Sequence, residues 1–218
     1  MQRDYDSGFI LMEVVVALLL MGVLLHGGSR ILSHLHQQKC QRETHARQQS
    51  ILKTLASYAA INGRLPWAAG KEGVENRATR QRFGYVPFKT LGLSVLYGKD
   101  GYGRFMRYHV ASFHAPPPSV SPLERYCRAA PENPLRHVHY DAALASDCIA
   151  VSLISHGPEV CDCSEERLDV LEGLPGHTVV WATRNTLLTL YGEGSCASFH
   201  QPLPTPGGGG TRMRGFGR

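Results

Sequence analysis

The segment FILMEVVVALLLMGVLL, Phe9 to Leu25, decides the fold, because its seventeen residues contain a single charged side chain, Glu13. As a helix this segment would span about 25 Å, slightly less than the roughly 30 Å hydrocarbon core of a bilayer. Residues 26–28 bring it close to that length, and the side chain of Arg30 can reach the headgroups beyond. The sequence therefore predicts one membrane-spanning helix over residues 9–28.

The carboxylate of Glu13 is costly at this position. An acidic residue at the centre of a membrane helix costs about 2.5 to 3.5 kcal/mol on insertion scales, and one nearer the end costs somewhat less. A secretory signal peptide would have a basic start, whereas the eight residues before Phe9, MQRDYDSG, contain one Arg and two Asp. An ordinary signal anchor gives no reason for the carboxylate. An ionisable side chain at this depth indicates a functional site.

The residues from Ser7 to Glu13, SGFILME, followed by VVVALLLMGVLL, resemble the processing site of type IV prepilins and type II secretion pseudopilins. In that family a short polar leader ends in Gly, the mature chain begins with Phe, and its fifth residue is a Glu inside an apolar helix. The resemblance implies that residues 1–8 are a leader, that a membrane prepilin peptidase cuts between Gly8 and Phe9, and that Phe9 is N-methylated. It also implies that Glu13 guides assembly into a filament.

The spacing of Phe9 and Glu13 has a physical use after such a cut. The new α-amine of Phe9 is a cation at the start of a helix, and the Glu13 carboxylate lies about one turn further along. In a filament the amine of an incoming subunit can pair with the Glu13 carboxylate of its neighbour in apolar surroundings. Because a buried unpaired charge is very costly, this pair would set the axial register even if it added little net stability.

Residues 29–62 are expected to continue the helix as an extracytoplasmic stem that ends at Asn62-Gly63, shortly before Pro66. An apolar stripe predicts that the second half of the stem packs on a domain: Ile51, Leu52, Leu55, Ala56 and Ala59. Residues 37–50, QQKCQRETHARQQS, are polar on all sides, and we expect them to bridge the membrane surface and the domain. The cations of the stem are expected to form a solvated face, with anionic lipid, acidic subunits or DNA as alternative partners: Arg30, Lys39, Arg42, Arg47 and Lys53.

The composition supports a packed domain, since 43% of the 218 residues are apolar and 19% are charged. After Gly63, short β-rich runs alternate with Gly and Pro, which places a globular domain at residues 63–201. Residues 104–112 alternate as in a half-buried strand, and residues 149–155 and 177–183 are fuller apolar runs. Antiparallel strands packed on the long, partly transmembrane N-terminal helix give an α+β fold. Residues 202–218, rich in Gly and Arg, are expected to be a flexible basic tail.

The domain carries a second, less specific resemblance, to the soluble region of a group of pilin-like proteins. In that group an LP turn follows the stem, a G-aromatic-P turn leads to TLGL, and a D-x-W/Y-G turn opens the next strand. The matching segments are RLP at 64–66, GYVPFKTLGL at 84–93, DGYG at 100–103 followed by Arg107-Tyr108, and VSLISHGP at 151–158. The resemblance implies a pilin-like arrangement. Trp67 stands where relatives tend to have Cys, so no disulfide is inferred at that position.

Cysteines exported by such a leader would lie where thiols oxidise. Five cysteines in the domain allow up to two disulfides: Cys127, Cys148, Cys161, Cys163 and Cys196. Their order does not identify the partners, although Cys161-Asp162-Cys163 is too tight to close on itself. Cys40, on the stem, is either a sixth partner or an intermolecular thiol.

No metal, cofactor or catalytic centre is expected. A zinc site would need these residues: His156, Cys161 and Cys163, completed by His109, His137 or His139. Its Cys-x-Cys pair lacks the usual Cys-x2-Cys spacing. A calcium site would need an acidic cluster that equally suits the start of a short helix: Asp162, Glu165, Glu166 and Asp169. His156 has no recognisable nucleophile and orienting acid around it, which favours packing at a strand end.

These features predict a structural subunit and not an enzyme: a minor pilin or pseudopilin of a type IV pilus or type II secretion filament. It would cross the inner membrane once, with its C-terminal domain in the periplasm. The resemblance implies a prepilin peptidase, other pilin or pseudopilin subunits and an inner-membrane assembly platform as partners, and no small-molecule substrate. The alternatives are an anchored periplasmic module that binds DNA or a secreted substrate, and an anchored metal-dependent enzyme. A net charge of +5 is too small to identify nucleic acid as a partner by itself.

Overall fold

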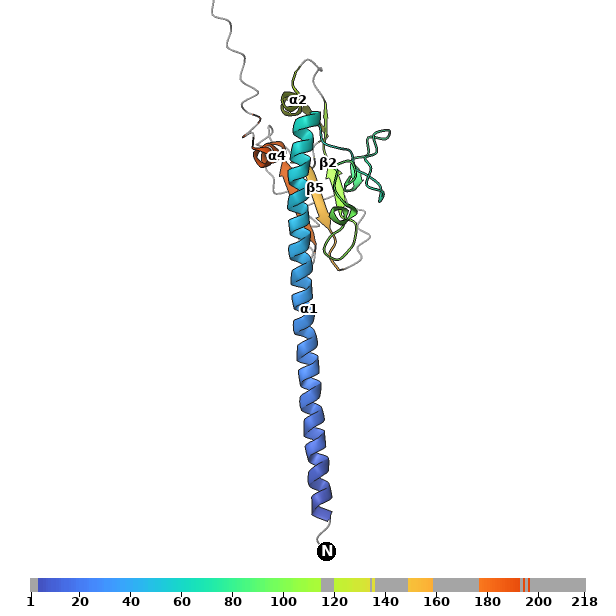
Figure 1. Ribbon diagram of the computed structural model, residues 1–218, viewed down its shortest axis with the longest axis vertical. Helices are drawn as coiled ribbons and strands as arrows, with labels where there is room; N and C mark the ends of the chain where they lie inside the picture. The colour runs from blue at the N-terminus through green and yellow to red at the C-terminus, as the bar shows by residue number, and fades with distance from the viewer. Residues whose placement is uncertain are drawn as a thin grey trace, which may run out of the picture.

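The computed structural model describes residues 4–114, 120–133, 135, 149–158, 177–192, 194 and 196. Helix α1 (Asp4–Asn62) is long and continuous, and its first half projects away from the domain that packs on its second half (Figure 1). The other helices described are η1, a 3-10 helix (Val95–Gly98), α2 (Pro122–Arg128) and α4 (Arg184–Tyr191). The strands described are β1 (Phe83–Tyr85), β2 (Arg107–Val110), β3 (Ser112–His114), β4 (Ala130–Asn133), β5 (Ile149–Ser155) and β6 (Thr178–Thr183).

Strands β1, β2, β5 and β6 form an antiparallel sheet in that order, and β3 pairs with β4 in a separate two-stranded sheet. The α+β fold and the three predicted strands are confirmed. The run predicted over 104–112 enters the sheet only at Arg107–Val110, after which the chain turns into β3. Strand β1 was not predicted, because three residues are too few to show a period of two.

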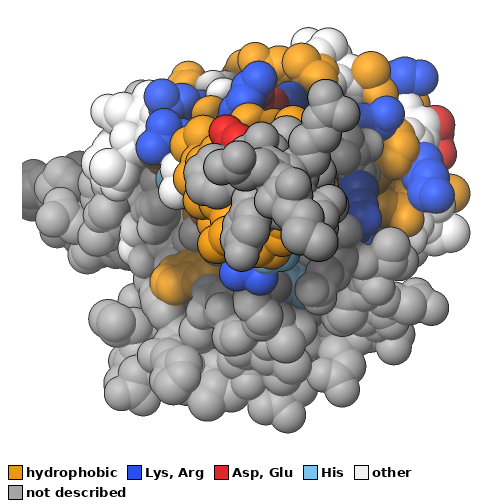
Figure 2. All heavy atoms as spheres, turned by 90° about the horizontal axis from the view of Figure 1, so that it is seen from below, with side chains coloured by type: hydrophobic (Ala, Val, Ile, Leu, Met, Phe, Trp, Pro, Cys, Tyr) orange, Lys and Arg blue, Asp and Glu red, His pale blue; other side chains and the backbone are white. Residues whose placement is uncertain are grey.

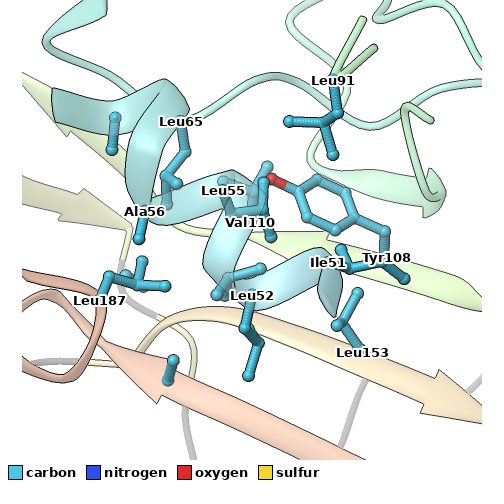
Figure 3. Close-up of a cluster of buried hydrophobic side chains, with 14 of the residues drawn as sticks. Ile51, Leu52, Leu55, Ala56, Leu65, Leu91, Tyr108, Val110, Leu153 and Leu187 are labelled. Atoms are coloured by element: carbon cyan, nitrogen blue, oxygen red, sulfur yellow. The ribbon is translucent and has the colours of Figure 1, made fainter. Parts of the chain in front are cut away.

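The register of the sheet decides which side chains face α1. Tyr108 pairs with Leu153 and faces the helix, whereas the next pair, His109 and Ser152, points to the opposite face. On the helix side, the predicted stripe of α1 is confirmed: Ile51, Leu52, Leu55, Ala56 and Ala59 are all buried. Figure 3 shows part of this stripe among Tyr108 and Val110 of β2, Leu153 of β5 and Leu187 of α4. Each large apolar side chain buried in this way contributes about 1.5 to 3 kcal/mol.

The expectation that residues 37–50 bridge the membrane and the domain is wrong for one face of that segment. Cys40, Thr44 and Gln48 are at most 5% exposed, and their spacing of four continues the buried stripe down the helix from Leu52. The domain therefore packs on α1 from about Cys40 towards the C-terminal end of the helix. The polar sequence of this face did not indicate burial. A polar side chain can nevertheless be buried at little cost when its hydrogen bonds are made inside the protein.

Hydrogen bonds to the domain explain how the polar face is buried. Thr44 Oγ1 donates to the carbonyl of Cys40 at 2.8 Å and accepts from the Gly101 N–H at 2.9 Å. Gln48 Nε2 donates to the carbonyls of Leu153, in β5, and Thr178, in β6, at 3.3 and 3.2 Å. The stem is thus bonded to two strands as well as packed on them.

The turn that starts at Asp100 closes the lower end of the domain on α1. Asp100 Oδ1 accepts from two backbone N–H groups of its own turn at 2.9 Å each, and Oδ2 accepts from the Ser155 hydroxyl at 2.7 Å. Arg47 of α1 donates to the carbonyl oxygens of Lys99 and Asp100 at 3.1 and 2.5 Å. A Cβ on Gly101 would overlap the backbone of Cys40, so the glycine is needed for close approach of the turn to the helix.

A buried carboxylate anchors the loop between α1 and β1. Glu75, 3% exposed in its side chain, accepts from Arg64 at 2.9 Å on both oxygens, from Arg77 at 2.5 Å and from the Trp67 N–H at 3.1 Å. It also accepts from the hydroxyl of Tyr58, on α1, at 3.3 Å. Burial by itself would raise the pKa of Glu75, but these bonds outweigh it and lower the pKa to about 2.

Arg184, the first residue of α4, holds the end of α2. Its guanidinium is buried and lies 5.1 Å from the centre of the Phe113 ring. Nη1 donates to three carbonyl oxygens at the C-terminal end of α2: Tyr126, Cys127 and Ala129. A cation is stabilised where helix carbonyls lack partners, so this contact closes the upper end of the domain.

Candidate assembly helix and domain surface

The first part of α1 presents a bare apolar surface. From Met12 to Leu24, the large apolar side chains that the structure describes are 45–74% exposed. In the described part of the chain, α1 is the one helix long and apolar enough to cross a membrane, and none of its apolar stretch is buried. A continuous apolar surface of this size is stable only when lipid or another apolar surface covers it.

The bare surface reaches beyond Arg30, the residue expected at the headgroups. Ile31, Leu32 and Leu35 are 63, 72 and 58% exposed. From Met12 to Leu35 the helix is about 36 Å long, which exceeds the hydrocarbon core of a bilayer. A bilayer would therefore leave part of this surface uncovered.

Glu13 lies within the bare surface, with its side chain exposed. It forms no ion pair with the side chains that the structure describes. Gly8 and Phe9 are part of the helix, which begins at Asp4, so residues 4–8 of the expected leader continue α1. The side chain of Phe9 lies outside the described residues. A carboxylate covered by lipid or protein is costly unless it is protonated or paired with a cation.

Two of the five candidate cysteines form a disulfide. Cys127, in α2, is bonded to Cys196, which follows α4, across a Cα–Cα distance of 5.1 Å. Cys148, Cys161 and Cys163 lie outside the described residues. Cys40 is a free, buried thiol whose Sγ lies 3.6 Å from His36 Nε2.

Three histidines of the sheet region, His109, His156 and His177, are packed against aromatic rings. His156 directly follows β5, as predicted, and its ring lies edge-on to His177 at 5.2 Å between centres. The His109 ring lies edge-on to Phe83 at 4.9 Å. Burial, followed by the charge of Arg107, lowers the pKa of His109 to about 4.

The described residues contain no group of three His, Cys, Asp or Glu side chains that could hold a metal ion. The remaining residues considered for zinc, Cys161, Cys163, His137 and His139, lie outside the described ranges. The same holds for the acidic cluster considered for calcium, at residues 162–169.

Basic and aromatic residues in and beside β1 and β2 form a cluster that was not predicted from the sequence. We call it the basic–aromatic face and define it as Lys71, Tyr85, Lys99, Phe105 and Arg107. The register pairs Tyr85 with Arg107, on the face opposite Tyr108. The signal was present in the sequence as aromatic and basic residues at alternate positions of 83–85 and 105–109, which only the pairing of β1 with β2 brings together.

The described residues thus divide the molecule into two functional parts. One is an apolar helix with an embedded carboxylate, which can associate with lipid or with similar helices. The other is a domain whose surface carries the basic–aromatic face, which can associate with anions. No family model, no curated protein and no solved structure matches this chain.

Proposed function

We propose that the chain is a structural subunit, a minor pilin or pseudopilin, of a type IV pilus or type II secretion filament. It is held in the inner membrane by the first half of α1, with its C-terminal domain in the periplasm. A prepilin peptidase cuts it after Gly8 and N-methylates Phe9. An inner-membrane assembly platform then inserts it beside other pilin or pseudopilin subunits.

The observation that carries this proposal is the position of Glu13 on the bare half of a helix whose other half is fixed to a domain. A lone carboxylate is costly both in lipid and in a packed helix bundle. The α-amine released at Phe9 would be a cation about one helical turn away along the axis, which suits pairing between adjacent subunits. A simple anchor has no need for either group.

The attachment of α1 to its domain supports this role. The turn that starts at Asp100 contacts α1 beside Cys40, and the Glu75 carboxylate accepts a hydrogen bond from Tyr58 of α1. Because α1 is continuous between these points, a register set at Glu13 also sets the position of the domain. A slip of one residue would move the domain by about 1.5 Å along the axis.

The cleavage step is tested by mass spectrometry of the mature N-terminus, after expression in cells that contain an active prepilin peptidase. The expected terminus is N-methylated Phe9. A Gly8→Val variant, which places a branched side chain at the cut, should keep residues 1–8. An intact N-terminus in the wild-type chain would overturn the proposal.

The role of Glu13 is tested separately from cleavage. Glu13→Ala should be processed like the wild type but be incorporated into filaments at a small fraction of its level, because the incoming amine loses its partner. Val15→Ala, a truncation at a neighbouring apolar position, is the control and should assemble normally. Normal assembly of Glu13→Ala would favour an anchored binding module, which has no use for this carboxylate.

A further inference from the structure

We propose that His156 and His177, the histidine pair, make the attachment of the lower end of the domain to α1 sensitive to acid. While both rings are neutral, the Asp100 turn stays on residues 40–48 of α1. Uptake of a proton by the pair opens this contact, and the core above it stays folded. The inference goes beyond the filament role and does not depend on it, because both histidines and their contacts lie within one chain.

The two histidines lie opposite each other at the lower end of the sheet. Strand β5 ends at Ser155 and β6 begins at Thr178, and these two residues are paired. His156 and His177 are the next residues beyond that pair. Their rings are edge-on, with 5.2 Å between centres. Two neutral rings are stable in this arrangement, whereas protons on both would bring two cations into contact.

The ring nitrogens of the histidine pair lack hydrogen-bond partners among the described residues. Nδ1 of His156 and both ring nitrogens of His177 are shielded from solvent in this way. A protonated imidazole donates from both of its nitrogens and therefore needs two acceptors. A proton added to the closed end would thus create a buried donor and a buried charge without a partner, which favours an arrangement in which water reaches the rings.

The charged groups around the pair also oppose protonation. Those that act on His156 among the described residues are His177, Arg107 of β2, and Asp100 and Arg104 of the turn. Asp100 is the one carboxylate in this set, and its oxygens already accept from two backbone N–H groups and from a hydroxyl of β5. Burial, followed by His177 and the charge of Arg107, lowers the pKa of His156.

A third histidine, His109 of β2, adds to this environment. Its Nδ1 is also buried without a partner among the described residues, and Arg107, His156 and Arg82 act on its charge. Because its pKa is lowered to about 4, it stays neutral in mild acid. Figure 2, seen from the N-terminal end, shows many more Lys and Arg than Asp and Glu side chains on the described surface around α1. The lower end thus offers little negative charge to compensate an added proton.

On the β5 side, the residues that flank His156 are bonded to the Asp100 turn. The Ser155 hydroxyl donates to Asp100 Oδ2 at 2.7 Å. Arg104 Nη1 donates to the carbonyl oxygen of Gly157 at 3.0 Å. A displacement of His156 would therefore also displace the turn that contacts α1.

On the β6 side, His177 precedes a residue that is bonded to α1 directly. The carbonyl oxygen of Thr178 accepts from Gln48 Nε2 at 3.2 Å. Gln48 Oε1 is buried and has no partner among the described residues, so this side chain is only partly satisfied in the closed state. Separation of the two rings would thus release α1 at Gln48 and at the Asp100 turn, and would leave the apolar core from Ile51 onward in place.

The direction of the pH effect follows from the lowered pKa of His156. In the open form this ring would be hydrated, with a pKa near its ordinary value of 6.5, so the open form binds more protons than the closed form. The closed form is therefore fully favoured above about pH 6.5 and loses this advantage as the pH falls. Between about pH 7 and about pH 5 the opening equilibrium should rise by roughly tenfold for one proton taken up.

The free thiol of Cys40 can report this opening, because Cys40 is 5% exposed and lies against Gly101 of the Asp100 turn. The full-length protein in detergent micelles is treated with dithiodipyridine, which reacts with thiols in mild acid as well as at neutral pH. Mass spectrometry of the Cys40 peptide gives the rate, and the rate in urea at the same pH corrects for intrinsic reactivity. Protection of Cys40 should fall roughly tenfold between about pH 7 and about pH 5.

The double variant His156→Phe with His177→Phe keeps two rings in place and removes the groups that titrate. It should protect Cys40 at neutral pH as the wild type does, and this protection should not fall in acid. His177→Phe alone loses no hydrogen bond of the described fold and should show a smaller fall than the wild type. A fall equal to that of the wild type in both variants would overturn the proposal, as would constant protection of Cys40 in the wild type.

Two controls separate the histidine pair from other histidines. His34→Gln with His45→Gln removes two exposed imidazoles from α1 and should keep the wild-type response. His36→Gln removes the ring that lies 3.6 Å from the Cys40 thiol and should also keep it. Loss of the response in His36→Gln would assign the effect to that contact and overturn the proposal.

Hydrogen exchange distinguishes a local opening from unfolding of the domain. After correction for intrinsic rates, the backbone amides of the Asp100 turn should lose protection in acid, whereas those of α2 and α4, at the upper end, should keep it. Loss of protection throughout the domain would overturn an opening confined to the lower end.

Discussion

Among single residues, Glu75 and Gly101 do most to fix the domain on α1. Glu75 collects two guanidinium groups, a backbone N–H and the Tyr58 hydroxyl, so one carboxylate connects a long loop to the helix. Gly101 acts through the absence of a side chain, because it lets the Asp100 turn touch the backbone of α1 at Cys40. Glu75 lies outside the motifs recognised in the sequence, whereas Gly101 belongs to the DGYG turn at 100–103.

Glu75→Gln should destabilise the domain by about 2 kcal/mol at neutral pH, measured by urea unfolding. The loss is smaller than the roughly 3 to 5 kcal/mol for breaking a buried ion pair. The reason is that Arg64 and Arg77 are 35 and 69% exposed, and solvent screens their charges. Glu72→Gln, at an exposed neighbouring position, is the control and should have little effect.

The same variant should change the response to acid. The pKa of Glu75 is lowered in the folded state to about 2, from an ordinary value of 4.5. The carboxylate therefore contributes its full stability above about pH 4.5, and this contribution is lost as the pH falls towards about 2. Wild type and Glu75→Gln should converge in stability over that interval. Parallel curves would show that the carboxylate does not account for the acid sensitivity.

Gly101→Ala should cost about 1 to 3 kcal/mol, because the new methyl group overlaps the Cys40 backbone and forces the turn away from α1. The loss should appear as a lower thermal midpoint of the domain. Gly22→Ala makes the same substitution on the bare part of α1, where no atom lies within 4 Å of the added carbon, and should not destabilise the domain. Equal stability of Gly101→Ala and the wild type would contradict the close approach.

At the scale of elements, α1 is a single helix in two environments. Its upper half buries a stripe that changes from polar side chains, Cys40, Thr44 and Gln48, to apolar ones from Ile51 onward. The side chains of its lower half that the structure describes, from Met12 to Leu35, are exposed. The helix thus connects a surface that needs an apolar partner to a domain that is packed and hydrogen-bonded onto it.

Leu55→Ala should destabilise the domain by about 2 to 5 kcal/mol, because Leu55 has no exposed surface and its truncation leaves a cavity beneath the sheet. Ile61→Ala on the same helix, 68% exposed, should change the free energy of unfolding by less than about 0.5 kcal/mol. Denaturant unfolding of both variants makes the comparison. A similar loss of stability in the two variants would mean that this stripe does not pack α1 on the sheet.

At the scale of the whole molecule, the two ends of the domain are closed by different means. The Asp100 turn closes the lower end with hydrogen bonds to α1, and the upper end is closed by Arg184 at the end of α2 and by the disulfide between Cys127 and Cys196. The disulfide joins residues 69 apart in sequence, so it restricts a large part of the unfolded chain.

Loss of this disulfide in Cys127→Ala should lower the free energy of unfolding by about 4 kcal/mol, the value that loop entropy gives for a closed loop of this length. Peptide mapping of the wild-type protein without reductant should find the peptides of Cys127 and Cys196 linked. Linkage of either cysteine to another position would contradict the pairing and remove the basis of the expected loss.

Much of this architecture could be predicted from local pattern. Hydropathy and helical spacing predicted the apolar helix and the stripe from Ile51 to Ala59, and alternation or apolar runs predicted three of the four strands of the main sheet. The buried face at Cys40, Thr44 and Gln48 was predicted wrongly, because the local sequence does not distinguish a buried polar residue from an exposed one. Which of five cysteines would pair was left open for a similar reason, since order along a chain does not give distance in space.

The sequence by itself determined the properties that depend on neighbours along the chain: the length of the apolar helix, the depth of Glu13 within it, the end of α1 at Asn62 and the α+β class. Only the tertiary structure decided that Gln48 bonds to β5 and β6, that Glu75 gathers Arg64 and Arg77, and that Tyr85 meets Arg107 on the face away from α1. The physical reason is that periodicity is a short-range property of the backbone. The satisfaction of a buried polar group and the grouping of charges require residues that strand pairing and helix packing bring together.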